Sequence, residues 1–212
     1  MSATLVVISG SSSPTFLEAT APELGLGCVL VPPQPTWGQL RETAERALDG
    51  VMEKGSHPVL AGHGHGGSLA LLLAAERQDV QGVIGLSAPS DFLRLVEPVK
   101  AHAPSRYQRW LDTFGSTPQA DPGLFRAASP IFATRRIQSP VLLVHGTADL
   151  IVPVEHTLWL YASLIHVGHS NVTMELVPTA GHYFERGLDG LQTARVAGRV
   201  GSWMAEIGRL TA

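Results

Sequence analysis

The sequence predicts an α/β fold with a mainly parallel central sheet of about six strands and helices on both faces. Short β-branched runs alternate with longer segments of helical period, which is the order of elements in such folds. Most of the runs are apolar throughout, as in strands that are covered on both faces. The 212 residues, 44% of them hydrophobic, suffice for one sizeable core, so we expect one domain over residues 1–212.

Six segments have the composition of strands. The first five are short apolar runs followed by serine, proline, glycine or histidine, and the sixth alternates apolar with polar residues. They cover residues 4–8, 28–31, 58–61, 82–86, 140–144 and 172–176. We expect the central sheet to be built from these segments.

Helices are expected between the strands. Thr36 and Gln39 have the spacing of a capping box, and an amphipathic stripe follows them. Residues 68–75 are apolar on almost every side, which predicts a helix in the middle of the molecule. Further helices are expected from Pro153 to about residue 167 and along the apolar stripe of residues 196–207.

The segment 91–126 is the least regular part of the chain, because prolines interrupt it, and we expect it to form a helical cap or lid. Within it, Arg106 and Arg109 lie beside Tyr107 and Trp110. Such a cluster can clamp an anionic or aromatic group, with Tyr107 and Trp110 as substrate-binding residues. The alternative interpretation is an ordinary amphipathic lid helix with a solvated face.

Charge and composition exclude several classes of protein. The 15 Lys and Arg against 18 Asp and Glu give a net charge of −3 without long runs of one sign, which argues against nucleic-acid binding. The longest apolar stretch, residues 69–75, is far shorter than a membrane span, so we expect a cytoplasmic protein without a membrane partner. The single cysteine, Cys28, rules out an internal disulfide and fits a reducing compartment.

Three loops that follow predicted strands carry the chemistry of the chain. They are residues 62–66, 145–149 and 179–182, and parallel strands bring such loops together at one edge of the sheet. Gly64 precedes Asp149 by 85 residues, and Asp149 precedes His182 by 33. This order is that of nucleophile, acid and histidine in one class of hydrolase.

Residues 58–70, 129–131, 140–149 and 181–184 resemble the α/β-hydrolase superfamily, and within it the branch of prolyl oligopeptidase and dienelactone hydrolase. The resemblance implies an α/β-hydrolase fold acting on a small organic substrate. It also implies that the backbone amides of His65 and Ser11 form an oxyanion hole. Ser9 and Gly10 stand where the family usually has a His-Gly-Gly motif, and we expect them to contact the substrate.

One departure from this family pattern affects the chemistry. The elbow G-x-S-x-G serves to expose a serine hydroxyl to a base, and here its central residue is Gly64. Ser68 would be the nucleophile only in a shifted register, which places it about one turn down the helix. Cys28 lies within a predicted strand and is a poorer substitute.

Without the serine, Asp149 and His182 still form a dyad that can move protons. This predicts an enzyme in which His182 activates water for hydrolysis, or removes a proton in a lyase or cyclase reaction. Two alternatives stay open: a non-catalytic pseudo-hydrolase that only binds a ligand, and an esterase or peptidase whose serine was replaced by glycine. Asp149 has a further alternative as a helix-capping acid ahead of Pro153.

Most of the other histidines are expected to be structural, whereas His65 is expected to line the mouth of the pocket. His63 and His65 point in different directions across a tight turn and lack further ligands nearby in sequence, so we expect no metal and no cofactor. We expect His145 to be structural at the end of a strand, and His156 to face solvent. The sheet edges and the last helix are surfaces through which a homodimer could form.

Overall fold

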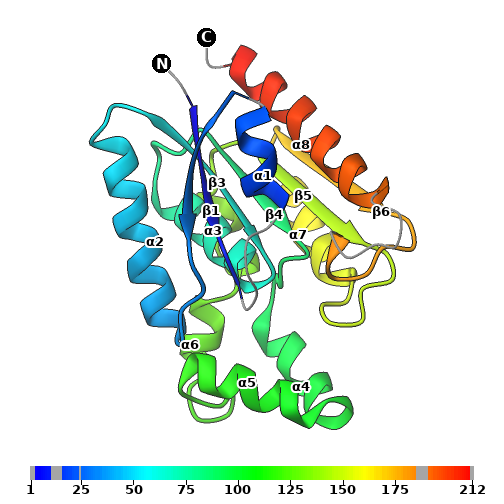
Figure 1. Cartoon of the computed structure of the whole chain (residues 1–212). Coiled ribbons are helices and arrows are strands. Elements are labelled where there is room, and N and C mark those ends of the chain that lie inside the picture. Colours follow the sequence, from blue (N-terminus) through cyan, green and yellow to red (C-terminus); the bar gives the residue numbers. More distant parts are fainter. Residues whose placement is uncertain (1–2, 11–15, 24, 185–190, 211–212) are drawn as a thin grey trace.

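The computed structural model describes residues 3–10, 16–23, 25–184 and 191–210. It confirms the predicted parallel sheet, whose six strands stand in the order β2-β1-β3-β4-β5-β6 (Figure 1). Every neighbouring pair is parallel. The strands are β1 (Ala3–Ile8), β2 (Gly27–Val31), β3 (His57–His63), β4 (Gly82–Leu86), β5 (Val141–Gly146) and β6 (Val172–Val177).

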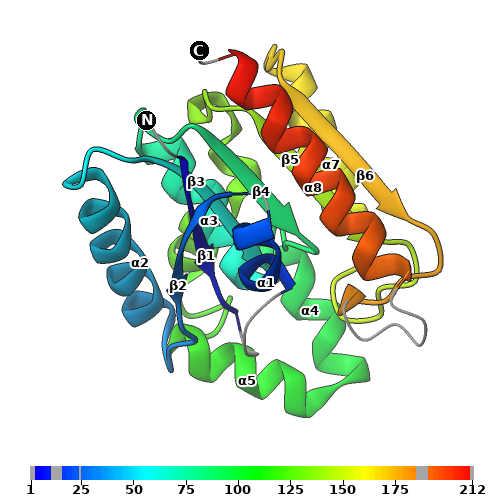
Figure 2. The ribbon, with the colours of Figure 1, turned by 45° about the horizontal axis from the view of Figure 1, so that its top comes forward.

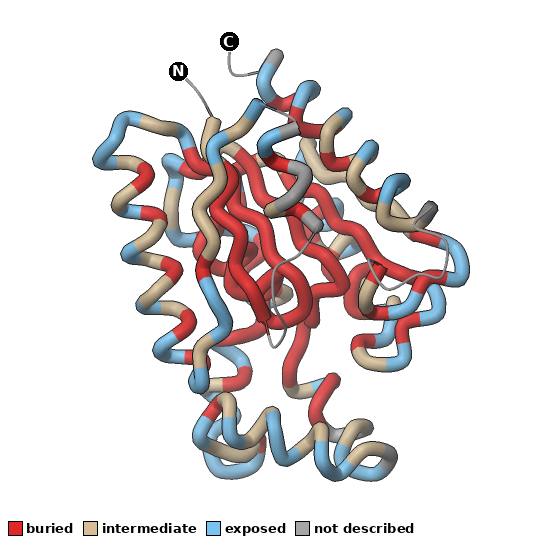
Figure 3. The backbone as a smooth tube through the Cα atoms, in the orientation of Figure 1, coloured by how far each residue is buried: buried red, intermediate tan, exposed pale blue. Residues whose placement is uncertain are grey.

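Helices cover both faces of the sheet (Figures 1 and 2). One face is covered by α2 (Trp37–Met52), α3 (His65–Glu76) and α7 (Glu155–His166). The other face is covered by α1 (Phe16–Glu23) and α8 (Leu191–Leu210). Alternate strand residues feed the two cores, since Val6 packs with the first set of helices and Leu5 and Val7 with the second. The strands β3, β4 and β5 are almost wholly buried, whereas the edge strands β2 and β6 are mostly half-buried (Figure 3).

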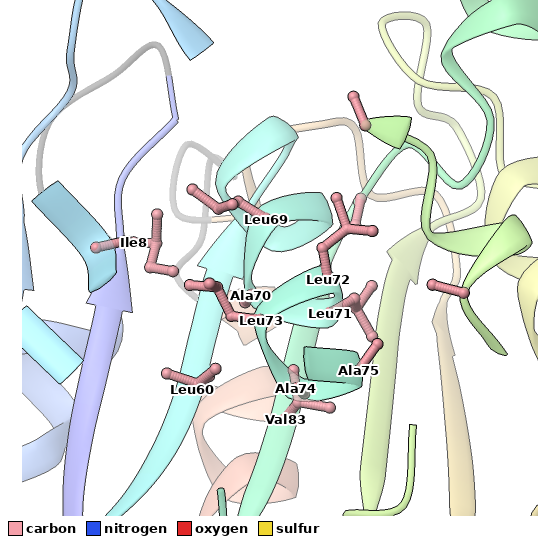
Figure 4. Close-up of a cluster of buried hydrophobic side chains, with 14 of the residues drawn as sticks. Ile8, Leu60, Leu69, Ala70, Leu71, Leu72, Leu73, Ala74, Ala75 and Val83 are labelled. Carbon is pink, nitrogen blue, oxygen red and sulfur yellow. The ribbon is translucent and has the colours of Figure 1, made fainter. Parts of the chain in front are cut away.

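The apolar helix in the middle of the molecule is confirmed as α3. Every residue of α3 from His65 to Ala75 is buried. Figure 4 shows its leucine and alanine side chains between Ile8, Leu60 and Val83 of three adjacent strands. Because β3 leads directly into this helix, the turn between them is held by the most densely buried part of the protein.

The segment between β4 and β5 forms three helices, α4 (Phe92–His102), α5 (Pro104–Phe114) and α6 (Pro122–Ala127), followed by two short 3₁₀ turns, Pro130–Phe132 and Thr134–Arg136. Asp91 and Asp121 cap α4 and α6 through their carboxylates, and Pro104 opens α5. In Figure 1, α4 and α5 lie beyond the carboxyl ends of the strands. Within the described residues, no helix is long and apolar enough to cross a membrane.

Candidate active site

The turn between β3 and α3 has the sharp geometry of a nucleophile elbow. Gly64 is the single residue between the two elements, with φ = 57° and ψ = −130°. Its N–H donates to the carbonyl of Leu86 at 2.9 Å, and its own carbonyl accepts from the Ser68 N–H at 3.2 Å. Glycine adopts this positive φ without cost, whereas a residue with a Cβ is strained there.

The glycines around Gly64 are required by the close approach of neighbouring backbone. A Cβ on Gly62 would collide with the carbonyl of Gly66, and one on Gly66 would collide with the Ile8 carbonyl oxygen. A Cβ on Gly67 would lie 2.7 Å from the Gly62 oxygen. The elbow therefore keeps the close packing of strand against helix that the family motif needs.

Position 64 itself is open on the side where a side chain would stand. A Cβ built there would lie 3.5 Å from His182 Nε2 and 3.8 Å from the adjacent ring carbon. A serine hydroxyl, one bond beyond such a Cβ, would be within reach of this nitrogen. Gly64 therefore faces His182 Nε2 across a space that a small side chain would fill.

His182 and Asp149 form the predicted pair. His182 Nδ1 donates to Asp149 Oδ2 at 2.7 Å, which leaves Nε2 facing Gly64. The other carboxylate oxygen of Asp149 accepts the N–H groups of Ile151 and Val152 at 2.7 and 2.9 Å. Asp149 therefore caps the following turn and orients His182 at the same time.

Asp149 is held as a carboxylate. Burial alone raises its pKa, but hydrogen bonds from His145, His182 and the Val152 amide outweigh burial and keep the pKa well below its ordinary value. A carboxylate in this place fixes the His182 tautomer and stabilises the imidazolium that forms when Nε2 takes a proton.

His145 is a member of the site that the sequence had suggested only as a structural residue. Its Nε2 lies 3.2 Å from Asp149 Oδ2 and 2.9 Å from the carbonyl oxygen of Val152. Both partners are acceptors, so Nε2 carries the proton, and Nδ1 then accepts from Thr157 Oγ1 at 2.7 Å. Its spacing of four residues before Asp149 was the signal that could have identified this contact.

His63 and His65 line the site in the neutral form. His63 Nε2 donates to the carbonyl of His182 at 2.7 Å, which ties the histidine loop to the end of β3. Burial and the neighbouring His182 charge lower the pKa of His63 to about 3 and the pKa of His65 to about 4. Among the residues that the structure describes, no three His, Cys, Asp or Glu side chains gather as a metal site.

A cavity of about 270 Å³ opens in front of His182. Of the two aromatic residues expected to contact the substrate, Trp110 lines it and Tyr107 does not, although both pack against the hydrophobic core. The lining residues are His63, Gly64, His65, Arg106, Arg109, Trp110, Thr113, Ile151, Val152, His182 and Tyr183.

The structure describes only part of the loop that was expected to contribute to the oxyanion hole and to contact the substrate. Ser9 is fully buried and does not line the cavity, in contrast to its predicted contact with substrate. Gly10 lies against the two elbow histidines, since a Cβ there would be 2.8 Å from the His63 carbonyl and 3.3 Å from His65 Nδ1. Ser11 lies outside the described residues. The His65 amide is the first of α3 and has no acceptor within the helix.

The two other nucleophile candidates do not face the cavity. Ser68 is fully buried, and its hydroxyl donates to the carbonyl of Pro89 at 2.6 Å. Cys28 lies on β2, where burial and the charge of Glu18 raise the pKa of its thiol. Neither side chain lines the space in front of His182.

His156 differs from its predicted place in solvent, because it is buried beside the lid. Its Nδ1 is 3.3 Å from the N–H of Ser90, which donates to it. Burial, helped by the charges of His145 and Arg94, lowers the pKa of His156 to about 4. The side chain is thus a further buried neutral histidine near the site.

Comparisons with known proteins show which proteins this chain is similar to. The model of the prolyl oligopeptidase family matches residues 44–206. Esterase LipQ of Mycobacterium tuberculosis is 28% identical over 193 residues, covering 77% of this chain and 44% of that protein. Esterase LipC of the same organism is 35% identical over 88 residues, covering 42% of this chain and 22% of that protein. The chain spans less than half the length of both curated relatives.

A solved structure extends the likeness to the whole fold. The acetyl ester-xyloside bifunctional hydrolase from Caldicellulosiruptor lactoaceticus superposes with a TM-score of 0.79 at 17% identity. The match covers 98% of this chain and 84% of that one. This likeness confirms the predicted α/β-hydrolase fold.

Proposed function

Since the chain belongs to the prolyl oligopeptidase family, we propose that it is an enzyme that acts on a small organic substrate without a serine nucleophile. The His182–Asp149 dyad supplies general acid and base chemistry in place of covalent catalysis. The observation that carries this proposal is the open position at Gly64, where a Cβ would lie 3.5 Å from His182 Nε2. A water molecule can occupy that space and be activated by the same nitrogen.

In the hydrolytic form of the reaction, His182 Nε2 takes a proton from this water while the water oxygen bonds to the substrate carbonyl carbon. We assign the stabilisation of the oxygen that becomes negative to the first amide of α3, at His65, which has no acceptor within the helix. The bond to the leaving group then breaks, and His182 returns its proton to the departing oxygen or nitrogen. General base catalysis of this kind contributes ~10² to 10⁴ in rate, which suits an activated ester or lactone.

The same dyad can remove a proton from a substrate carbon or hydroxyl, which is the lyase or cyclase form of the proposal. The two forms differ in whether water enters the product. Turnover in ¹⁸O-labelled water separates them, because only hydrolysis places the label in the carboxyl product.

The deciding experiment compares the wild type with Gly64→Ser, Gly64→Ala and His182→Ala on 4-nitrophenyl acetate near pH 7.5. We expect slow wild-type turnover that needs His182 and shows no burst. Gly64→Ser should gain a burst and react with a fluorophosphonate probe, whereas the wild type should not react. Gly64→Ala is the matched control, because it adds the Cβ and its strain without a hydroxyl, and it should lower turnover by filling the water position.

Two results would contradict the proposal. Wild-type turnover that persists in His182→Ala removes the dyad from the reaction, and labelling of the wild type by the probe reveals another nucleophile. If the wild type is inactive while Gly64→Ser is active, the chain is instead a ligand-binding pseudo-hydrolase with an intact remnant of the site.

A further inference from the structure

One face of the lid helix α5 supplies a positively charged wall to the cavity. Arg106, Arg109, Trp110 and Thr113 line it, and their spacing of three and four residues puts them on one side of the helix. The Trp110 ring meets His65 edge to face, with 5.6 Å between ring centroids. This contact sets the arginines of α5 over the same space that His182 faces.

No acidic side chain is among the cavity's lining residues, as far as the chain is described. The Asp149 carboxylate lies behind His182, and its oxygens already accept hydrogen bonds. His63 and His65 are neutral, because burial lowers the pKa of each far below 7. The fixed charge of the cavity therefore comes from Arg106 and Arg109.

The two arginines differ in their hydrogen bonds to the rest of the protein. Arg106 Nη1 donates to the carbonyl of Leu150 at 3.1 Å, which ties α5 to the loop after β5. The other N–H groups of that guanidinium remain available to a ligand. The Arg109 guanidinium has no hydrogen-bond or ion-pair partner among the described residues. The acid one turn further along α5, Asp112, instead accepts from the Gln108 amide at 2.9 Å.

We propose that the substrate carries a carboxylate, which Arg109 binds together with the remaining donors of Arg106. A guanidinium presents a planar fork of N–H donors that fits the two oxygens of a carboxylate. Trp110 then packs against the apolar part of the substrate, and the reacting group lies between Gly64 and His182. The cavity of about 270 Å³ is below the usual ~300–1,000 Å³ of sites for drug-sized ligands, so the acid is small.

This proposal rests on the proposed function only where it places the reacting group of the substrate between Gly64 and His182. Recognition of the carboxylate needs no turnover, so it can be measured with inert ligands. The probes are 3-phenylpropanoate, its uncharged amide 3-phenylpropanamide, and phenyl phosphate, with binding followed by isothermal titration calorimetry at pH 7.5 and low salt.

We expect the acid to bind the wild type about tenfold more tightly than the amide, as for a hydrogen bond to a charged partner. Arg109→Gln should remove this preference and leave amide binding unchanged, and Arg109→Lys should restore part of it. Arg136→Gln is the matched control, because Arg136 is exposed and lies outside the cavity, and it should change neither affinity.

The proposal is overturned if acid and amide bind equally, if neither binds at millimolar concentration, or if Arg109→Gln keeps the preference. If phenyl phosphate binds more tightly than the acid, the proposal of a carboxylate substrate is wrong and the site binds a phosphorylated substrate instead. These results are separate from those for catalysis. An inactive protein that still prefers the acid refutes only the proposed reaction, and an active protein without the preference refutes only the carboxylate site.

Discussion

Acid should destabilise this protein sharply between pH 7.5 and pH 5. His63, His65 and His156 are buried as neutral side chains, and burial is the main cause that lowers the pKa of each to between about 3 and about 4 from 6.5. In the unfolded chain these histidines take up protons near pH 6.5, which the folded protein does not. The free energy of unfolding is therefore at its full value above that pH and falls as the pH drops toward 4.

The magnitude follows from the size of these pKa differences. At pH 5 an unfolded histidine is almost fully protonated, while a buried one with a pKa of about 4 is almost fully neutral. Each such residue then costs about 2 kcal/mol of stability at pH 5, and the three together about 6 kcal/mol. Because whole domains are stable by only about 5–15 kcal/mol, a loss of this size brings the protein close to unfolding.

Urea denaturation followed by circular dichroism at pH 7.5, 6 and 5 measures this loss. In His156→Gln the difference between pH 7.5 and pH 5 should shrink to about 4 kcal/mol, because one of the three proton uptakes is gone. His166→Gln, on the exposed side of the same helix, controls for the substitution itself and should keep the wild-type difference. A free energy of unfolding at pH 5 within about 1 kcal/mol of the value at pH 7.5 would refute the reasoning.

Three further substitutions test the elbow and the dyad. Ser68→Ala should lower the free energy of unfolding in urea by about 1–2 kcal/mol without changing turnover, because the buried hydroxyl only bonds a backbone carbonyl. Gly66→Ala should lower the free energy of unfolding by more than about 2 kcal/mol in the same assay, because its Cβ collides with the Ile8 carbonyl. The control Gly198→Ala, at an exposed position of α8, should raise the free energy of unfolding by about 0.5–1 kcal/mol. Asp149→Asn should lower turnover about 10²–10⁴-fold with ligand affinity retained, and unchanged turnover would remove the acid from the mechanism.

The sheet was predictable because its strands are covered on both faces. Such strands must be apolar at nearly every position, so the first five runs stand out from the segments around them. The edge strand β6 is half-buried and was recognised instead by its alternation of apolar and polar residues. The helix α1 was not predicted. Its sequence has no clear apolar stripe and contains Pro22, and its place on the sheet is secured by tertiary contacts of Leu17 and Ala21 (Figure 2).

The core of the candidate site was also predictable, for a topological reason. Parallel strands end at a common edge, so the loops that carry Gly64, Asp149 and His182 meet whatever happens elsewhere. The orientation of the helices within residues 91–126 was not predictable from the sequence. Which side of α5 faces the cavity depends on how the helix docks, and that choice put Arg109 in the lining and left Tyr107 out of it.

The site needs no side chain at position 64 to keep its arrangement, for a physical reason. The elbow depends sterically on Gly62 and Gly66, whose missing side chains let strand and helix backbones approach, and position 64 contributes no packing. His182 is held by Asp149 and by the contact of its carbonyl with His63, neither of which involves residue 64. A residue with a Cβ would carry about 1–3 kcal/mol of backbone strain at this φ, and glycine carries none. The scaffold therefore holds Asp149 and His182 in place without any contribution from a side chain at position 64.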